Sequence, residues 1–242
     1  MSLASLVVSP ILDLELREFI VDVLRTAGPF FFMGMQISSL KTAITIAKER
    51  SVGDLSPIPF LSLLMNGSVW LIYGSVKSDW TILVPNFTAV LTGAVCASLF
   101  HINSKATVSP LLYLTVLVVV VSSIYLGSRS DLHSLGLIGV VLSILLMGSP
   151  LATVSIVVRE KRTDSMPFTT SLTTFLNCLA WTSYGYLVAD DPMLWIPSSI
   201  GLILAMFQLA LFVVYGLPLK SDDGHILQKY DMMVDLQVRS IA

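Results

Sequence analysis

A nine-residue stretch of the chain is written twice, and the two copies lie 111 residues apart. Asn66–Gly74 reads NGSVWLIYG and Asn177–Gly185 reads NCLAWTSYG, so asparagine, tryptophan, tyrosine and glycine recur in the same register. Each copy lies within a long apolar segment. A membrane chain that repeats a polar and aromatic cluster in this way is predicted to build one site from two similar halves.

The low charge of the chain is typical of a protein that crosses a membrane several times. Of 242 residues, 55% are hydrophobic and only 12% are charged, whereas a soluble domain carries about 25% charge. The net charge of −2 offers no basic surface for nucleic acid. Seven segments are apolar and long enough to cross a hydrocarbon core of about 30 Å. These predicted spans are Thr26–Ala47, Ser56–Val76, Thr81–Ile102, Val108–Leu126, His133–Val158, Pro167–Val188 and Met193–Tyr215.

Lysine and arginine are distributed unevenly between the short loops, and this predicts the orientation of the chain. The odd-numbered loops carry more of them, such as Lys48 and Arg50 in the first loop and Arg159, Lys161 and Arg162 in the fifth. Loops rich in these residues remain on the cytoplasmic side. The odd loops and the C-terminus are therefore predicted to be cytoplasmic, and the N-terminus is predicted to lie outside.

The repeat extends over three spans on each side of an unpaired fourth span. Lys48-Glu49 is matched by Arg159-Glu160, and the third span of each half opens with Pro85-Asn86 or Pro197-Ser198. Because one extra crossing separates the halves, both enter the membrane from the same side. We expect an all-α membrane protein of seven transmembrane helices, with two parallel three-helix repeats joined by a linker helix. Its predicted parts are an N-terminal extracellular segment (1–25), a first repeat (26–102), the linker helix (108–126), a second repeat (133–215) and a cytoplasmic tail (218–242).

In each copy of the repeated stretch, the asparagine, tryptophan and tyrosine share one helix face, because they are spaced four and three residues apart. Hydrogen bonding between helices is the favoured role for Asn66 and Asn177, as is common for amides inside a membrane. Two roles stay open for Trp70 and Trp181. They either belong to an aromatic belt at the membrane interface or form a flat wall that stacks on a sugar ring.

Polar contacts to a solute are predicted one helix further along the chain. Asn86 and Ser198 directly follow prolines, which interrupt the backbone ladder of a helix. A neutral amide and a hydroxyl suit an uncharged solute that carries many hydroxyl groups. No Asp or Glu falls inside the seven predicted spans, whereas coupled carriers commonly need an ionisable group there. The pattern therefore predicts facilitated diffusion of a neutral solute, with no enzymatic activity, cofactor or metal.

Taken together, these motifs resemble the SWEET family of sugar facilitators. The resemblance runs from about Gly28 to Tyr215. It implies an uncoupled transporter of mono- or disaccharides that works by alternating access in the plasma membrane, with an internal membrane as the alternative. The implied partners are a sugar and the lipid bilayer; two repeats form the minimum unit, and a homo-oligomer is compatible with it. The motifs that carry the resemblance are SVGDLSPIPF, MNGSVWLIYG, VPNFTAVLTG, GSPLATVSIVVREKRTDSMPF, LNCLAWTSYG and IPSSIGLILAMFQLALF.

The resemblance also implies roles for individual residues. Two indoles across one pocket leave little volume, so a glucose-like monosaccharide is favoured over sucrose. The implied sugar-binding residues are Asn86, Ser198, Trp70 and Trp181, where Ser198 stands at the position of the family's second asparagine. The implied extracellular gate consists of Tyr73, Asp190 and Lys77. The implied hinge prolines are Pro59, Pro150 and Pro167, with Ser39 at the fourth position.

Two other functions remain as alternatives. The first is an amino acid carrier of the PQ-loop type, although its Pro-Gln signature is replaced here by Ser56-Pro57 and Met166-Pro167. The second is a seven-helix receptor, but such receptors have no three-plus-three repeat. The loop Arg159–Met166 is also short for a surface that couples to a signalling partner.

Overall fold

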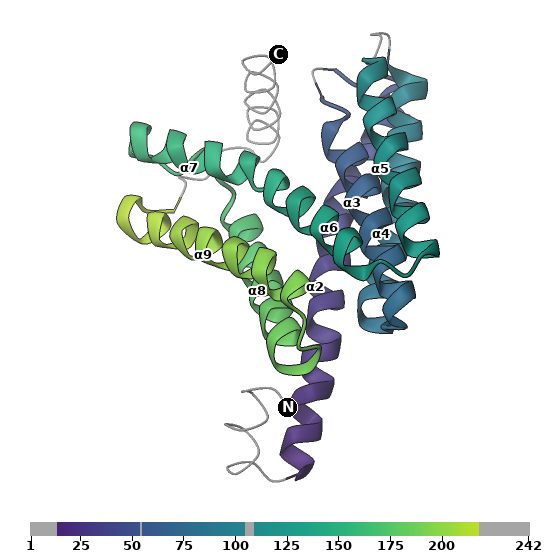
Figure 1. Cartoon of the computed structure of the whole chain (residues 1–242). Coiled ribbons are helices and arrows are strands. Elements are labelled where there is room, and N and C mark those ends of the chain that lie inside the picture. Colours follow the sequence, from purple (N-terminus) through teal and green to yellow (C-terminus); the bar gives the residue numbers. More distant parts are fainter. Residues whose placement is uncertain (1–13, 54, 105–108, 218–242) are drawn as a thin grey trace.

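The computed structural model describes residues 14–53, 55–104 and 109–217, and over these residues the chain is helical with short connections (Figure 1). A π-helical turn, η1 (Tyr184–Val188), directly continues α8 (Phe168–Ser183). The predicted tail, 218–242, lies outside the described residues. The helices are α2 (Leu14–Glu49), α3 (Ile58–Lys77), α4 (Trp80–Asn103), α5 (Pro110–Ser128), α6 (Leu132–Leu146), α7 (Gly148–Glu160), α8 (Phe168–Ser183) and α9 (Pro192–Tyr215).

The seven predicted spans are all present as helices. Within the described part of the chain, six helical segments are long and apolar enough to cross a membrane: α2, α3, α4, α5, α9, and the pair α6 and α7 taken together. Helix α8 has 16 residues of its own, and with η1 it covers the predicted sixth span, Pro167–Val188. The fold class predicted from the sequence is confirmed.

The first helix begins earlier than predicted. Helix α2 starts at Leu14, well before the predicted start of the first span at Thr26. Charged side chains between positions 14 and 25 lower the hydropathy there, but none of these residues breaks a helix. Part of the predicted N-terminal segment, 1–25, is therefore an extension of the first helix. Residues 1–13 lie outside the described residues.

The first helices of the two repeats differ in continuity. In the second repeat, α6 ends at Leu146 and α7 begins at Gly148, and the N–H of Met147 turns back to the carbonyl of Ile144 at 3.0 Å. Pro150 favours a break at this point, because its ring clashes with the carbonyl of Leu146, four residues earlier. At the matching position in the first repeat stands Ser39, and α2 passes through it without interruption.

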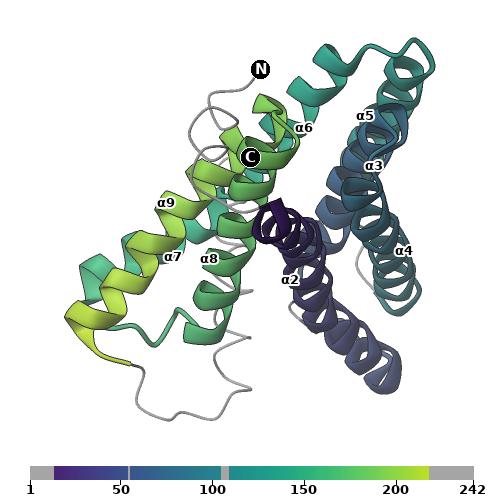
Figure 2. The ribbon, with the colours of Figure 1, turned by 90° about the horizontal axis from the view of Figure 1, so that it is seen from below.

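Each repeat packs around its third helix. The repeats meet where the first helix of each contacts the second helix of the other. Helix α4 packs against both α2 and α3, and α9 packs against α6, α7 and α8. Between the repeats, α2 contacts α8 and α3 contacts α6. The linker helix α5 packs on α3 and α6 and exposes Leu111, Leu117 and Val121, as expected for a lipid-facing helix. Figure 2 shows α3, α4 and α5 on one side of the molecule and α7, α8 and α9 on the other, with α2 between them.

The buried core is shared at one end of the molecule and divided at the other. At the end where α4 and α9 begin, here called the gate end, a single cluster joins residues of both repeats, including Trp70, Ile82, Tyr184 and Leu194. Toward the opposite end, the first repeat has a core of its own around Ile46 and the second repeat has one around Val157, Leu211 and Phe212. Inside a membrane, helices are held together by close van der Waals packing and by hydrogen bonds between helices. The repeats are therefore joined most tightly at the gate end, where the packed cluster is shared.

Candidate substrate pocket and gate

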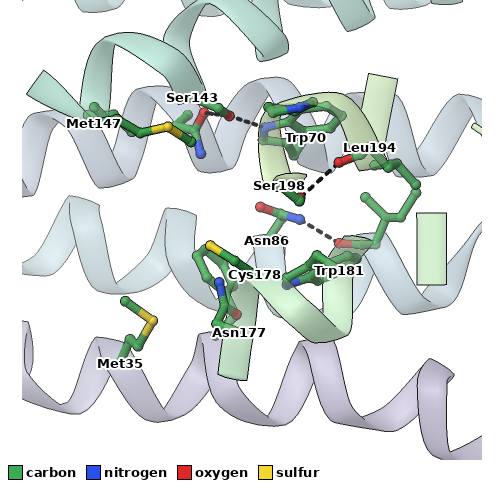
Figure 3. Close-up of a pocket in the computed structure, with 15 residues that line it drawn as sticks. Met35, Trp70, Asn86, Ser143, Met147, Asn177, Cys178, Trp181, Leu194 and Ser198 are labelled. Atoms are coloured by element: carbon green, nitrogen blue, oxygen red, sulfur yellow. Dashed lines mark hydrogen bonds between the residues drawn. The ribbon is translucent and has the colours of Figure 1, made fainter. Parts of the chain in front are cut away.

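A cavity of about 290 Å³ lies between the two repeats, next to the shared core. Its wall is built from α2, α3, α4, α6, α8 and α9, together with Met147. Figure 3 shows side chains of both repeats converging on it. Trp70, Trp181, Asn86 and Ser198, the four residues predicted to bind a solute, all line this cavity. Every lining side chain is uncharged.

Asn86 and Ser198 are held in the same way although their side chains differ. The amide nitrogen of Asn86 donates to the carbonyl of Ile82 at 2.7 Å, and the hydroxyl of Ser198 donates to the carbonyl of Leu194 at 2.8 Å (Figure 3). Both bonds reach back four residues within a helix that contains a proline one position earlier. Asn86 retains an amide oxygen and a second N–H for a ligand, whereas Ser198 has used its only donor.

The two indoles pack against glycines of the opposite repeat. A Cβ atom placed on Gly139 of α6 would lie 2.8 Å from the Trp70 ring, and one on Gly28 of α2 would lie 3.0 Å from the Trp181 ring. Gly28 and Gly139 are themselves 111 residues apart. Each tryptophan therefore lies on the bare backbone of the other repeat's first helix. The rings both line the cavity and join the halves, which is not the geometry of an interfacial belt.

Asn66 and Asn177, both predicted to link helices, have different environments. The carbonyl oxygen of Asn66 accepts a hydrogen bond of 3.3 Å from Ser143 on α6, as expected for an amide that joins two helices. The carbonyl oxygen of Asn177 is buried and has no hydrogen-bond partner among the described residues. Both residues line the cavity. The prediction is therefore wrong for Asn177, because Phe32, the counterpart of Ser143 on α2, has no polar atom to offer.

The gate end is closed by two equivalent hydrogen bonds between the repeats. Tyr73 Oη donates to Oδ2 of Asp191 at 2.7 Å, and Tyr184 Oη donates to Oδ2 of Asp79 at 2.6 Å. Lys77 adds an ion pair to Asp191. In each case a tyrosine from the second helix of one repeat contacts the residue that caps the third helix of the other.

Asp79 and Asp191 are positioned by the helices that they begin. Oδ1 of Asp79 accepts from the backbone N–H of Thr81, and Oδ1 of Asp191 accepts from that of Met193, both at 3.0 Å. Aspartate is favoured at this position because its oxygen satisfies an N–H that has no partner within the helix. The second oxygen of each carboxylate is then free to accept from a tyrosine.

The gate aspartate inferred from the sequence is one residue out of place. Asp190 was predicted as the partner of Tyr73, but its side chain is exposed and its backbone is left-handed, with φ of 48°. Asp191 contacts both Tyr73 and Lys77. A signal was present in the sequence, because Asp79 and Asp191 both stand directly before a third span and are 112 residues apart. The same signal would have found the second pair, Tyr184 and Asp79.

The implied hinge prolines all lie at helix beginnings, away from the gate end. Pro59 is the second residue of α3, Pro167 is the cap of α8, and Pro150 is in the first turn of α7. Ser39, at the fourth position, is inside α2. Among the residues described here, no group of three His, Cys, Asp or Glu side chains could hold a metal ion.

Comparison with known proteins places the chain in a family. The family model described as a sugar efflux transporter for intercellular exchange matches residues 22–108 and 133–218, which are the two repeats. Over 220 residues the chain is 31% identical to the sugar transporter SWEET1 of Caenorhabditis elegans, covering 90% of this chain and 71% of the relative. The chain belongs to the SWEET family.

Other members agree with this assignment across kingdoms and in three dimensions. The bidirectional sugar transporter SWEET7 of Arabidopsis thaliana is 30% identical over 221 residues, with 86% of this chain and 83% of the relative covered. A solved structure of a eukaryotic SWEET transporter superposes with a TM-score of 0.69 at 25% identity, covering 83% of this chain and 98% of the other. SWEET proteins are transporters rather than enzymes.

Proposed function

We propose that this protein is a facilitative transporter of a glucose-like monosaccharide, which binds in the cavity between the repeats. The observation that carries the proposal is the pair of indoles, Trp70 and Trp181, on opposite repeats at a cavity without charged side chains. A flat indole face stacks on the C–H face of a sugar ring, and neutral amides and hydroxyls bind its hydroxyl groups without the cost of burying a charge.

The size of the cavity supports a monosaccharide. A volume of about 290 Å³ lies at the lower end of the range of about 300–1,000 Å³ that is common for small-molecule sites. Trp70 and Trp181 both pack against glycine backbone, so neither ring can move away from the cavity without pushing the first helix of the other repeat aside. A disaccharide would require that movement.

Alternating access is supported by the unequal closure of the two ends. The tyrosine–aspartate pairs and the shared core close the gate end, while the repeats have separate cores toward the other end. In the proposed cycle, the pairs break and the repeats rock about the helix beginnings at Pro59, Pro150 and Pro167. The loops rich in lysine and arginine favour an orientation with the gate end outside the cell and the C-terminus in the cytoplasm, and the plasma membrane is the proposed location.

Uptake of labelled sugars into proteoliposomes tests this proposal, with and without an imposed pH gradient. Glucose uptake that follows the sugar gradient alone is the expected result. Flux that follows the proton gradient would contradict uncoupled transport. Faster transport of sucrose than of any hexose would contradict the monosaccharide, and absence of flux for all sugars would return the amino acid carrier and the receptor to contention.

A further inference from the structure

The two halves of the cavity are alike in sequence but differ in their hydrogen bonding. In one half, the indole N–H of Trp70 donates to the hydroxyl of Ser143, and that hydroxyl donates to the carbonyl oxygen of Asn66, both at 3.3 Å. A single hydroxyl therefore joins an indole and an amide that lie four residues apart on one helix face. Figure 3 shows the Trp70–Ser143 bond at the cavity wall.

In the other half, the same indole and amide are present but the hydroxyl is missing. Trp181 and Asn177 repeat the spacing on α8 and both line the cavity. The position that matches Ser143 is Phe32 on α2, which also lines the cavity. The indole N–H of Trp181 donates no hydrogen bond to a described residue, and the carbonyl oxygen of Asn177 is buried without a partner among them. A buried acceptor left in this way costs about 1–3 kcal/mol.

We propose that a hydroxyl group of the transported sugar binds between the indole N–H of Trp181 and the amide of Asn177, and makes there the two kinds of hydrogen bond that Ser143 makes in the first half. This inference rests on the proposed function and adds the position at which the site distinguishes one sugar from another. The sugar hydroxyl accepts from the indole and donates to the amide oxygen. Half a turn about the last torsion of Asn177 brings that oxygen to the cavity side.

The asymmetry also determines how the sugar lies in the cavity. Trp70 has its N–H occupied by Ser143, so it offers the ligand only its apolar face. Trp181 offers both a face and a donor. The sugar therefore stacks on both rings but forms its hydrogen bonds mainly with side chains of α8. One of its hydroxyl groups is recognised more strictly than the others.

Proteoliposome uptake of glucose and of its single-deoxy derivatives tests the inference. In the wild-type protein, at least one derivative is expected to enter about five- to tenfold more slowly than glucose, as loss of one neutral hydrogen bond requires. Trp181→Phe keeps the ring and removes the N–H, and Asn177→Leu keeps the approximate volume and removes the acceptor. In both variants the ratio of the uptake rate of glucose to that of this derivative should fall to about one.

The first repeat supplies matched controls. Trp70→Phe and Asn66→Leu remove groups that Ser143 already occupies, so the ratio should remain at its wild-type value whatever happens to the rates themselves. Thermal stabilisation of each purified variant by the same sugars compares the binding of glucose with that of its derivatives without transport. A variant that folds but does not transport therefore still reports on the site.

Two results would overturn the inference. If all single-deoxy derivatives enter the wild-type liposomes as fast as glucose, no hydroxyl is read by hydrogen bonds. If the ratio is lost in Trp70→Phe and Asn66→Leu but kept in the α8 variants, recognition lies in the first half. Both leave the transport function intact, whereas absence of any sugar uptake by the wild-type protein would refute the proposed function and the inference together.

Discussion

Tyr184 donates a hydrogen bond of 2.6 Å to Oδ2 of Asp79, and this bond joins the second repeat to the residue that caps α4. The bond from Tyr73 to Asp191 is the same contact with the repeats exchanged. The two contacts differ in one respect. Lys77 adds an ion pair to Asp191, and its Nζ atom lies over the Tyr73 ring, 5.7 Å from the ring centre. The contact between Tyr73 and Asp191 is therefore the stronger of the two, and the contact between Tyr184 and Asp79 is the weaker.

The first prediction is that Tyr184→Phe opens the gate end more than Tyr73→Phe does. Without Tyr73, Asp191 keeps its ion pair with Lys77. Without Tyr184, Asp79 keeps the bond that caps its own helix, which does not join the repeats. A hydrogen bond to a charged group contributes about 1.5–3 kcal/mol, so Tyr184→Phe should raise the population open at the gate end by about ten- to a hundredfold.

Spin labels at Ser78 and Asp190, both exposed in the connections of the gate end, report the opening as a distance distribution. Tyr186→Phe is the matched control, because this tyrosine is 45% exposed and packs edge-on against Trp195 without joining the repeats. An equal response of Tyr186→Phe and Tyr184→Phe would show that the hydroxyl bond to Asp79 does not hold the gate.

The second prediction separates two adjacent aspartates. Asp191→Asn keeps an oxygen that can cap α9 but removes the charge that pairs with Lys77, so the free energy of unfolding should fall by about 1–3 kcal/mol. Asp190→Asn changes an exposed side chain and should stay within about 0.5 kcal/mol of the wild type. Thermal unfolding in detergent measures both, and a larger effect at Asp190 would contradict the gate geometry.

Where one register related the two halves, sequence reasoning selected residues that the structure brings together. The 111-residue offset in the second helices pointed to Trp70 and Trp181, and the proline-polar pairs in the third helices pointed to Asn86 and Ser198. All four residues line one cavity. Helical periodicity places such residues on a common face, and the repeat then requires that the two faces meet.

The failures came from contacts between elements that periodicity does not relate. Asn177 differs from Asn66 only because α2 presents Phe32 where α6 presents Ser143. Which first helix faces which second helix depends on how the repeats dock, and the sequence pattern of α8 alone contains no record of it. Asp190 was implied by the family resemblance, which did not separate two adjacent aspartates. The offset of 112 residues at the third helices, where the second repeat has one extra residue, relates Asp79 to Asp191 instead.

The third prediction tests the packing of the indoles on glycine. Gly28→Ala and Gly139→Ala would each place a methyl group within about 3 Å of an indole, at 3.0 Å from Trp181 and 2.8 Å from Trp70. Overpacking of this kind costs about 1–3 kcal/mol, and the displaced ring enters the cavity, so sugar uptake should fall with the melting temperature. Gly34→Ala is the control on α2.

At Gly34 a Cβ meets nothing within 4 Å, and alanine there gains up to about 1 kcal/mol of helix propensity. Its melting temperature should therefore stay the same or rise. If Gly28→Ala behaves like Gly34→Ala in both melting and uptake, the Trp181 ring is free to move, and the argument for a small sugar loses its support.

The fourth prediction concerns the hinge position without a proline. Ser39 lies inside the unbroken helix α2, and its carbonyl accepts a weak bond from the thiol of Cys96 at 3.6 Å. Ser39→Pro would remove an N–H from the ladder and press the ring against the carbonyl of Met35, a residue that lines the cavity. We expect a loss of about 3 kcal/mol in the free energy of unfolding and a sharp fall in uptake.

The reverse exchange, Pro150→Ser, should raise the melting temperature and slow transport, because it allows α6 and α7 to become one straight helix. Faster transport by Ser39→Pro would instead show that the first repeat rocks as the second does and gains from a fourth hinge.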